Sequence, residues 1–376
     1  MRNNRIAVSV FYFCMGLCFS TWASRIPDIK DILGLGAAQL GSILFALPVG
    51  QFLALPFSGG FVTRFGSKRV LPVAIFLYAC GLTFIGLAST PWHLVIALMF
   101  FGISGNLSNI SVNTQGVTVE QLYARPIMAA FHGAWSIAGF TGALLGLGAI
   151  ALKLSPYQHF SIVATLVVLV TLIFKKHLVL VPPNPHAPKR KKFFSRPEGI
   201  LFQLGIIGFC SMATEGAMFD WSGVYFKEVI RVPAVLVPVG YASFMIMMAS
   251  GRFVADRLIA KFGRQRVLFM NGLLISTGMF IAVAFPYLVP ATIAFLIVGF
   301  GVSAVVPSVY SVAGRSSSTP GIALAAVTSV SYLGFLMGPP LIGWIASVSS
   351  LRVSYAVVGS FGFCISYIVS RFRELD

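Results

Sequence analysis

Acidic residues are scarce in this chain of 376 residues, which carries only 10 Asp and Glu. All charged residues together make up 10% of the sequence, whereas a soluble domain carries about 25%. This shortage argues against a soluble enzyme. The 57% of hydrophobic residues excludes a disordered chain, which needs the opposite balance. An apolar chain of this length can instead form a bundle of membrane helices.

Cysteine is also rare. The five Cys residues lie in apolar stretches, none has the spacing of a metal site, and their odd number argues against a disulfide framework. The chain has no Gly-x-x-x-x-Gly-Lys-Ser/Thr phosphate loop, which speaks against ATP-driven transport, and it has no nucleophile–His arrangement. We therefore expect that the protein is not an enzyme and binds no cofactor or metal.

Long apolar runs are the main feature that the sequence does have. A membrane span needs about 20 apolar residues, and short polar or Pro/Gly breaks divide the chain into twelve candidate spans. They lie near 6–24, 38–60, 70–88, 93–118, 127–151 and 157–175, and then near 200–224, 235–256, 267–286, 289–313, 321–346 and 353–371. The first run resembles a signal peptide but has no clear cleavage site, so we expect it to remain as a transmembrane helix.

One long polar connector, from Lys175 to Glu198, separates the two sets of spans. It contains four prolines and the basic run Lys189–Lys192. If the N-terminus and this connector lie on one side, that side collects all but six of the 27 Lys and Arg. Because positive residues stay cytoplasmic, we expect both termini and the connector in the cytoplasm. The net charge of +17 then reflects topology rather than a surface for nucleic acid.

The two sets of spans also repeat each other. The matches keep their order at offsets of 197 to 199 residues: Trp22 with Trp221, Gly41 with Gly240, Gly66 with Gly263, Phe101-Gly102 with Phe300-Gly301, and Gly139 with Gly338. Such an offset is typical of two halves related by an axis along the membrane normal. The sequence therefore predicts an all-α membrane protein with two six-helix bundles, 1–176 and 199–376, joined by a cytoplasmic linker, 177–198.

The loop from Gly59 to Arg69, between the second and third spans, has a sequence that resembles a known family motif. It resembles the signature loop of the major facilitator superfamily, Gly-x-x-x-Asp-Arg-x-Gly-Arg-Arg, with Thr63 where the family usually has Asp. The second half keeps an acid, Asp256. The resemblance implies the major facilitator fold and a gating role for these loops, although they can also be simple basic turns. The gating candidates are Gly59, Arg64, Gly66, Lys68, Arg69, Arg252, Asp256, Arg257, Gly263 and Arg264.

A narrower resemblance concerns the stretch from Phe131 to Gly139. It looks like the His-x-x-Phe-Gly-x-Gly stretch of the fucose-permease-like sugar:proton symporters. The stretches Thr21–Pro27 and Glu215–Ser222 look like those of a largely uncharacterised bacterial branch of that group. The resemblance implies proton-coupled uptake of a small polar solute, such as a sugar.

Three ionisable residues inside spans are candidates for proton coupling, because such residues are costly in a membrane and usually functional. Glu215 lies near the middle of the seventh span, and it can also be a structural carboxylate bonded to a neighbouring helix. Asp220 follows it and can instead pair with Arg25 or Lys227. His132, in the fifth span, can relay protons or simply be hydrogen-bonded.

Polar and aromatic residues suggest a substrate cavity. Asn106, Asn109 and Asn113 fall on one face of the fourth-span helix, where amides can bind a hydroxylated solute or tie helices together. Gln115 points to the opposite face, and we leave it out. The other cavity candidates supply hydroxyl groups or aromatic rings: Ser211, Ser222, Trp135, Tyr310 and Tyr332.

Together these features predict a secondary active transporter that moves a small polar solute by alternating access, with proton symport as the expected coupling. A proton-antiport exporter of drugs or metabolites is the alternative. We expect a multi-pass monomer in the bacterial inner membrane, whose partners are the solute, protons and the lipid bilayer, and no nucleic acid.

Overall fold

The computed structural model describes residues 1–123, 127–180, 199–315 and 320–372, without the side chains of residues 56, 63, 128–129, 256, 314–315 and 320–326. These ranges fold into helices joined by short turns, and they contain no strand. Twelve helical segments are long and apolar enough to cross a membrane. The predicted all-α fold with twelve spans is therefore confirmed, and the chain is a multi-pass membrane protein. Most of the predicted linker, 181–198, lies outside the described residues.

The helices form two compact units. Unit 1 comprises Met1–Leu35 and Ile43–Pro188, and unit 2 comprises Gly36–Ser42 and Lys189–Asp376. Unit 1 holds α1 (Arg2–Ser24), α2 (Ile26–Ile32), α4 (Ala46–Phe65), α5 (Ser67–Gly86), α6 (Pro91–Tyr123), α7 (Met128–Ala151), α8 (Pro156–Phe174) and a 3₁₀ turn at Lys175–His177. Unit 2 holds most of α3 (Ala37–Leu44), then α9 (Ile200–Tyr225), a π-helical turn at Phe226–Ile230, a 3₁₀ turn at Ala234–Leu236, α10 (Val239–Phe262), α11 (Arg264–Ala284), α12 (Leu288–Ser303), α13 (Val305–Arg315), α14 (Pro320–Val348) and α15 (Leu351–Arg371).

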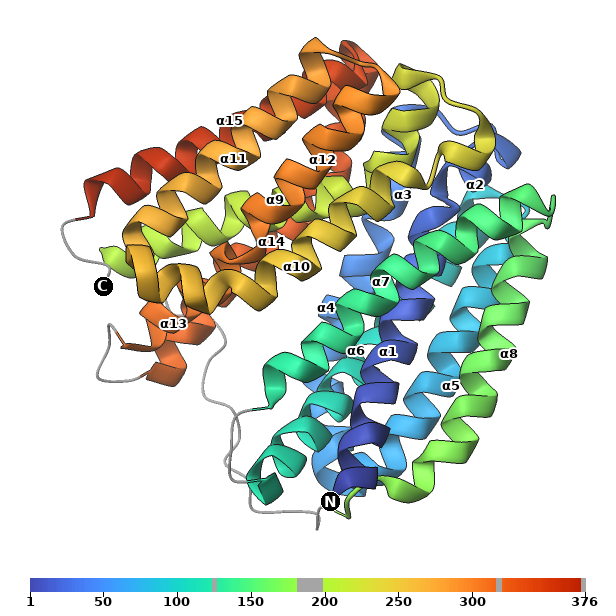
Figure 1. Cartoon of the computed structure of the whole chain (residues 1–376). Coiled ribbons are helices and arrows are strands. Elements are labelled where there is room, and N and C mark those ends of the chain that lie inside the picture. The colour runs from blue at the N-terminus through green and yellow to red at the C-terminus, as the bar shows by residue number, and fades with distance from the viewer. Residues whose placement is uncertain (124–126, 181–198, 316–319, 373–376) are drawn as a thin grey trace. The chain divides into compact units, whose positions relative to one another are not determined.

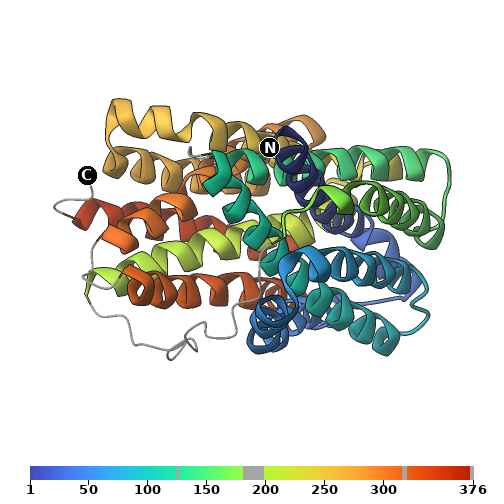
Figure 2. The same cartoon turned by 90° about the horizontal axis from the view of Figure 1, so that it is seen from below.

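Within each unit the long helices pack side by side (Figures 1 and 2). In unit 1, α1 packs along α7 and α4 along α6, and in unit 2, α9 packs along α14 and α10 along α12. The repeated tryptophans, Trp22 and Trp221, are both fully buried. Lipid is as apolar as the side chains, so helices in a membrane associate through close packing at small residues rather than through a hydrophobic effect.

The second and tenth spans are each broken into two helices, which the sequence analysis did not predict. The break lies at Phe45 between α3 and α4, and at Ala304 between α12 and α13. A proline stands three residues after each break, Pro48 and Pro307. Since proline has no N–H for the carbonyl four residues before it, its ring interrupts the helix at this point. Neither break recurs in the other half. At the offset of 197 residues that separates Gly66 from Gly263, Phe45 corresponds to Ala242 in α10 and Ala304 to Leu107 in α6, and both lie within unbroken helices.

The two signature loops are turns of a single glycine. Gly66 connects α4 to α5 with φ 78° and ψ 140°, and Gly263 connects α10 to α11 with φ 81° and ψ 151°. Positive φ at these angles is accessible to glycine and strained for other residues. The matching dihedral angles support the predicted repeat, and the other residues of the predicted loops lie within helices.

Glycine contacts set the register of the repeat in the second to fourth spans. A Cβ atom on Gly102 of α6 would collide with the carbonyl oxygen of Leu47, and one on Gly299 of α12 with that of Phe244. Each residue of the second contact lies 197 positions after its counterpart in the first. The pairing of Phe101-Gly102 with Phe300-Gly301 is therefore wrong by two residues.

This register also changes which residue of the first half corresponds to Asp256. Counting back from Gly66 and Gly263, Asp256 corresponds to Gly59 and not to Thr63. The counterpart of Thr63 is Ala260, so neither half has an acid where the family usually carries one. The side chain of Asp256 itself lies outside the described residues.

Candidate functional site

Glu215 on α9 lies against a basic partner within unit 2. Its Oε1 atom is 3.4 Å from Nη2 of Arg252 on α10, and both residues lie in candidate spans. The side chain of Glu215 is 13% exposed and that of Arg252 is 30% exposed. Opposite charges that are removed from water lower the cost of burying each other. Arg252, predicted as a residue of a gating loop, thus lies in a helix and pairs with the acid predicted for coupling.

The face of α9 that carries Glu215 is lined by hydroxyl groups. Ser211 and Ser222 are fully buried, and their hydroxyls have no hydrogen-bond partner among the described residues. Tyr310 on α13 places its hydroxyl 3.8 Å from the Met212 sulfur and within electrostatic reach of Glu215. The structure therefore brings Tyr310 and Ser211 close to Glu215, as a polar site requires.

An aromatic cluster surrounds the next turn of α9. The Phe219 ring centroid lies 6.1 Å from that of Tyr241, 5.7 Å from that of Phe244 and 6.3 Å from that of Phe335. Tyr332 on α14 stacks on Phe335 with centroids 6.2 Å apart. Tyr332 thus joins the site through Phe335, a residue that the sequence analysis did not identify.

Asp220, also on α9, has no partner of this kind. Its half-buried carboxylate makes no hydrogen bond or ion pair within the part of the chain that the structure describes. Arg25, one partner considered for it, is paired instead with Asp28, with Nε to Oδ2 at 2.5 Å, and donates to the Leu154 carbonyl.

A hydrogen-bonded network in unit 1 links the predicted asparagines to α1. The Tyr12 hydroxyl donates to Oδ1 of Asn113 at 2.7 Å, and the Asn113 amide donates to the carbonyl oxygen and to Oδ1 of Asn109. The Tyr12 ring makes an edge contact with His132 at 5.2 Å. Asn106, on the same face of α6, has a buried Oδ1 atom with no hydrogen-bond partner in the described ranges.

This Tyr12 network joins three of the predicted residues, Asn109 and Asn113 on α6 and His132 on α7. Tyr12 was missed because an apolar run contains no local signal for a hydrogen bond to another helix. Trp135 contacts the ring of Phe19, with centroids 6.2 Å apart, and Phe19 lies about two helical turns after Tyr12 on α1.

The remaining gating candidates lie in the helices that flank the glycine turns. Gly59 and Arg64 are in α4, Lys68 and Arg69 in α5, Arg257 in α10 and Arg264 at the start of α11. Arg64 places its guanidinium 5.4 Å from the ring of Phe65.

Gln115, which the sequence analysis left out, holds the segment that follows α8. Its side chain is fully buried, with Nε2 donating to the Ser67 hydroxyl at 2.8 Å and to the Val179 carbonyl at 2.8 Å. Its Oε1 atom accepts from the Val179 N–H at 2.9 Å. Asn4 also donates to the His177 carbonyl at 3.0 Å. These bonds tie the beginning of the connector to the signature turn and to α1.

Replacing Gln115 with alanine is expected to release this segment. Three hydrogen bonds are lost, each worth about 0.5–1.5 kcal/mol, so local opening should increase about tenfold or more. Limited digestion with trypsin, followed by mass spectrometry, measures cleavage after Lys175 and Lys176. Gln121→Ala, at an exposed position of the same helix, is the control, and equal cleavage rates in both variants would contradict the proposed clamp.

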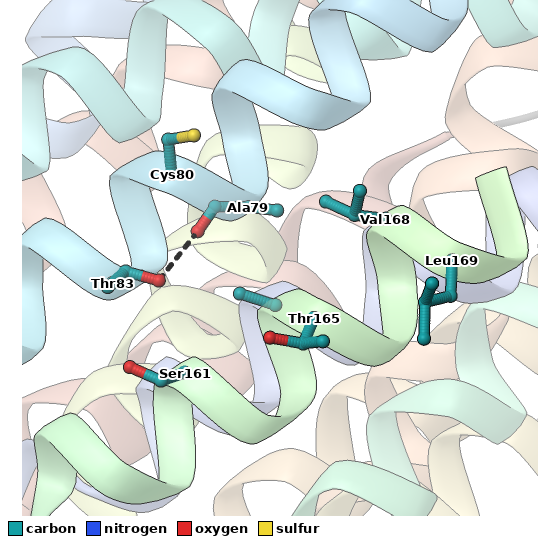
Figure 3. A pocket seen from close by; sticks show the side chains of 8 residues that line it. Ala79, Cys80, Thr83, Ser161, Thr165, Val168 and Leu169 are labelled. Carbon is teal, nitrogen blue, oxygen red and sulfur yellow. Dashed lines mark hydrogen bonds between the residues drawn. The ribbon is translucent and has the colours of Figure 1, made fainter. Parts of the chain in front are cut away.

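A groove between α5 and α8 lies apart from these residues. It has a volume of about 280 Å³ and is lined by Cys80, Thr83, Ser161 and Thr165 among others (Figure 3). Thr83 donates a hydrogen bond to the Ala79 carbonyl there. No predicted site residue lines this groove, so it does not guide the functional assignment. Within the described residues, no three His, Cys, Asp or Glu side chains are arranged to hold a metal ion.

Comparisons with known proteins agree with the fold. The family model "Major Facilitator Superfamily" matches residues 8–335. An uncharacterised MFS-type transporter of Yersinia pestis is 32% identical over 357 residues, which cover 95% of this chain and 92% of the relative. A bacterial homologue of the human lysosomal transporter Spinster superposes with a TM-score of 0.79 at 15% identity, covering 97% of this chain and 95% of that chain. A D-xylose–proton symporter superposes with a TM-score of 0.75 at 14% identity, covering 98% and 97%.

Proposed function

Since the chain belongs to the Major Facilitator Superfamily, we propose that it is a secondary active transporter that takes up a small polar solute, such as a sugar, by alternating access and proton symport. We place it in the bacterial inner membrane as a monomer with both termini in the cytoplasm. The D-xylose–proton symporter among its structural neighbours supports the choice of solute class and coupling ion.

The observation that carries this proposal is the Tyr12 network of unit 1. Asn106, Asn109 and Asn113 present amides on one face of α6, and the Oδ1 atom of Asn106 has no partner among the residues that the structure describes. Amide groups can donate and accept at once, as the hydroxyl groups of a sugar require. Within a span, an unused amide oxygen is costly unless a ligand or water satisfies it.

Proton coupling is proposed for the acids of α9 and for His132. Glu215 and Asp220 lie in the seventh span, and His132 contacts Tyr12 of the amide network. Ionisable residues within membrane helices line ion pathways in many transporters.

The aromatic cluster of unit 2 favours a second candidate function. Phe219, Tyr241, Phe244 and Phe335 would suit an amphipathic solute better than a sugar. A proton-antiport exporter of drugs or metabolites is therefore the alternative. Expression that protects cells from toxic cations, without sugar uptake, would favour it.

Removing the Tyr12 network is expected to weaken solute binding. A panel of radiolabelled sugars, sugar acids, nucleosides and amino acids identifies the solute in proteoliposomes with an imposed proton gradient. For that solute, Asn113→Ala should raise KM about threefold to tenfold, because a hydrogen bond is worth about 0.5–1.5 kcal/mol. Gln121→Ala is the control on the same helix. An unchanged KM in Asn113→Ala would remove the network from the binding site.

A further inference from the structure

We propose that Asp220, rather than Glu215, is the residue that binds and releases the coupled proton. This inference rests on the proposed function, because it assigns the proton to one of two acids on the same helix. Both acids lie on α9, but unit 2 surrounds them differently.

Glu215 already has a compensating charge. Arg252 lies 3.4 Å from it, so a proton that bound to Glu215 would compete with a guanidinium. Protonation would also remove the negative charge that faces the Arg252 guanidinium within a span, which is unfavourable. The ion pair therefore suits a carboxylate that stays charged and holds α9 against α10.

Asp220 has no such compensation. It is half-buried, and it makes no hydrogen bond or ion pair with any residue for which the structure gives a side chain. The charge of Asp220 interacts electrostatically with two hydroxyl groups, those of Tyr241 on α10 and Tyr355 on α15. Both carry buried hydroxyls for which the described part of the chain offers no hydrogen-bond partner. Both groups are neutral donors, and no basic side chain among the described residues forms an ion pair with Asp220.

The charged groups nearest this end of unit 2 act on other residues. Arg352 of α15 interacts electrostatically with Tyr225, and its Nη2 atom donates a hydrogen bond to the Val283 carbonyl at 2.5 Å. Lys227 and Glu228 follow in the π-helical turn, and neither is without a partner. On α9 itself, Glu215 is the other acid near Tyr241, and its charge is met by Arg252.

These surroundings make the charge state of Asp220 depend on water. When water reaches the site, the carboxylate is solvated and can release its proton to the solution. When the site closes, a charged carboxylate without a partner would be very costly, so a proton must be taken up first. The proton is bound from water on one side and released to water on the other, and nothing else is consumed.

Infrared spectroscopy of the full chain in lipid vesicles tests this assignment without a solute. The C=O stretching band of a protonated carboxylic acid should appear near neutral pH and disappear on titration to alkaline pH. We expect this band to persist in Glu215→Gln and to be lost in Asp220→Asn. Glu228→Gln, at an exposed acid of unit 2, is the matched control and should leave the band unchanged.

Isotope labelling keeps the test valid if Asp220→Asn fails to fold. In the wild-type protein, aspartate labelled with ¹³C in its side-chain carboxyl should shift the band, and glutamate labelled in the same way should not. A band that shifts with labelled glutamate, that survives in Asp220→Asn, or that is missing from the wild-type protein would overturn the assignment.

Transport measurements separate this inference from the proposed function. For a transported solute, Asp220→Asn should keep exchange of solute across the membrane and lose accumulation driven by a proton gradient. If no gradient drives uptake in the wild-type protein while the infrared band behaves as expected, the proposed symport fails and the assignment of the proton to Asp220 stands.

Discussion

Replacing Arg252 with alanine is expected to destabilise the protein by about 3 kcal/mol, because removal of one partner of a buried ion pair leaves the other charge uncompensated. The value is at the lower end of the range for such pairs, since Arg252 is 30% exposed. Transport should be lost as well. Thermal unfolding of the purified protein and solute uptake measure the two effects.

A charge-neutral double variant distinguishes an ion pair from simple packing. Glu215→Gln combined with Arg252→Gln removes both charges and should recover most of the stability that Arg252→Ala loses, without restoring transport. Lys261→Ala removes an exposed basic residue from the same helix and is the control. If the double variant is as unstable as Arg252→Ala, the pair does not account for the loss.

The second large effect is expected at Gly102 and its counterpart, Gly299. A methyl group at either position would collide with a backbone carbonyl of the neighbouring helix, that of Leu47 or Phe244. Backbone cannot move aside as a flexible side chain can, so the helices must separate, at a cost of about 1–3 kcal/mol or more. We expect Gly102→Ala and Gly299→Ala each to lower Tm and the yield of folded protein.

The control for this pair is Gly148→Ala. No atom lies within 4 Å of the position that a Cβ on Gly148 would take. This variant should keep the wild-type Tm, because alanine also has the better helix propensity. Unchanged Tm values in both Gly102→Ala and Gly299→Ala would mean that these helix crossings are looser than the structure indicates.

The number of membrane spans and their approximate limits were predictable, because a chain in lipid must satisfy its backbone within each helix. Each span is therefore a long apolar run, which can be recognised in the sequence without knowing how the helices pack. The breaks at Phe45 and Ala304 were not predictable in this way. Pro339 and Pro340 stand within the unbroken helix α14, so a proline in an apolar run does not by itself mark a break.

The candidate site was predictable only along single helices. The 3.6-residue period placed Asn106, Asn109 and Asn113 on one face. Partners on other helices could not be found by spacing, so Tyr12 and the pairing of Arg252 with Glu215 were missed. Gln115 was set aside for lying opposite the asparagines, and its own partner, Val179, is 64 residues away in the sequence.

The turns at Gly66 and Gly263 consist of one residue each, so the two helices that each turn joins cannot move independently. A connection this short passes a displacement of α4 directly to α5, and one of α10 directly to α11. Each pair of helices is therefore expected to move as one rigid body, joined at the glycine turn. Bending is left to the places where the helical hydrogen bonds are already interrupted, before Pro48 and before Pro307.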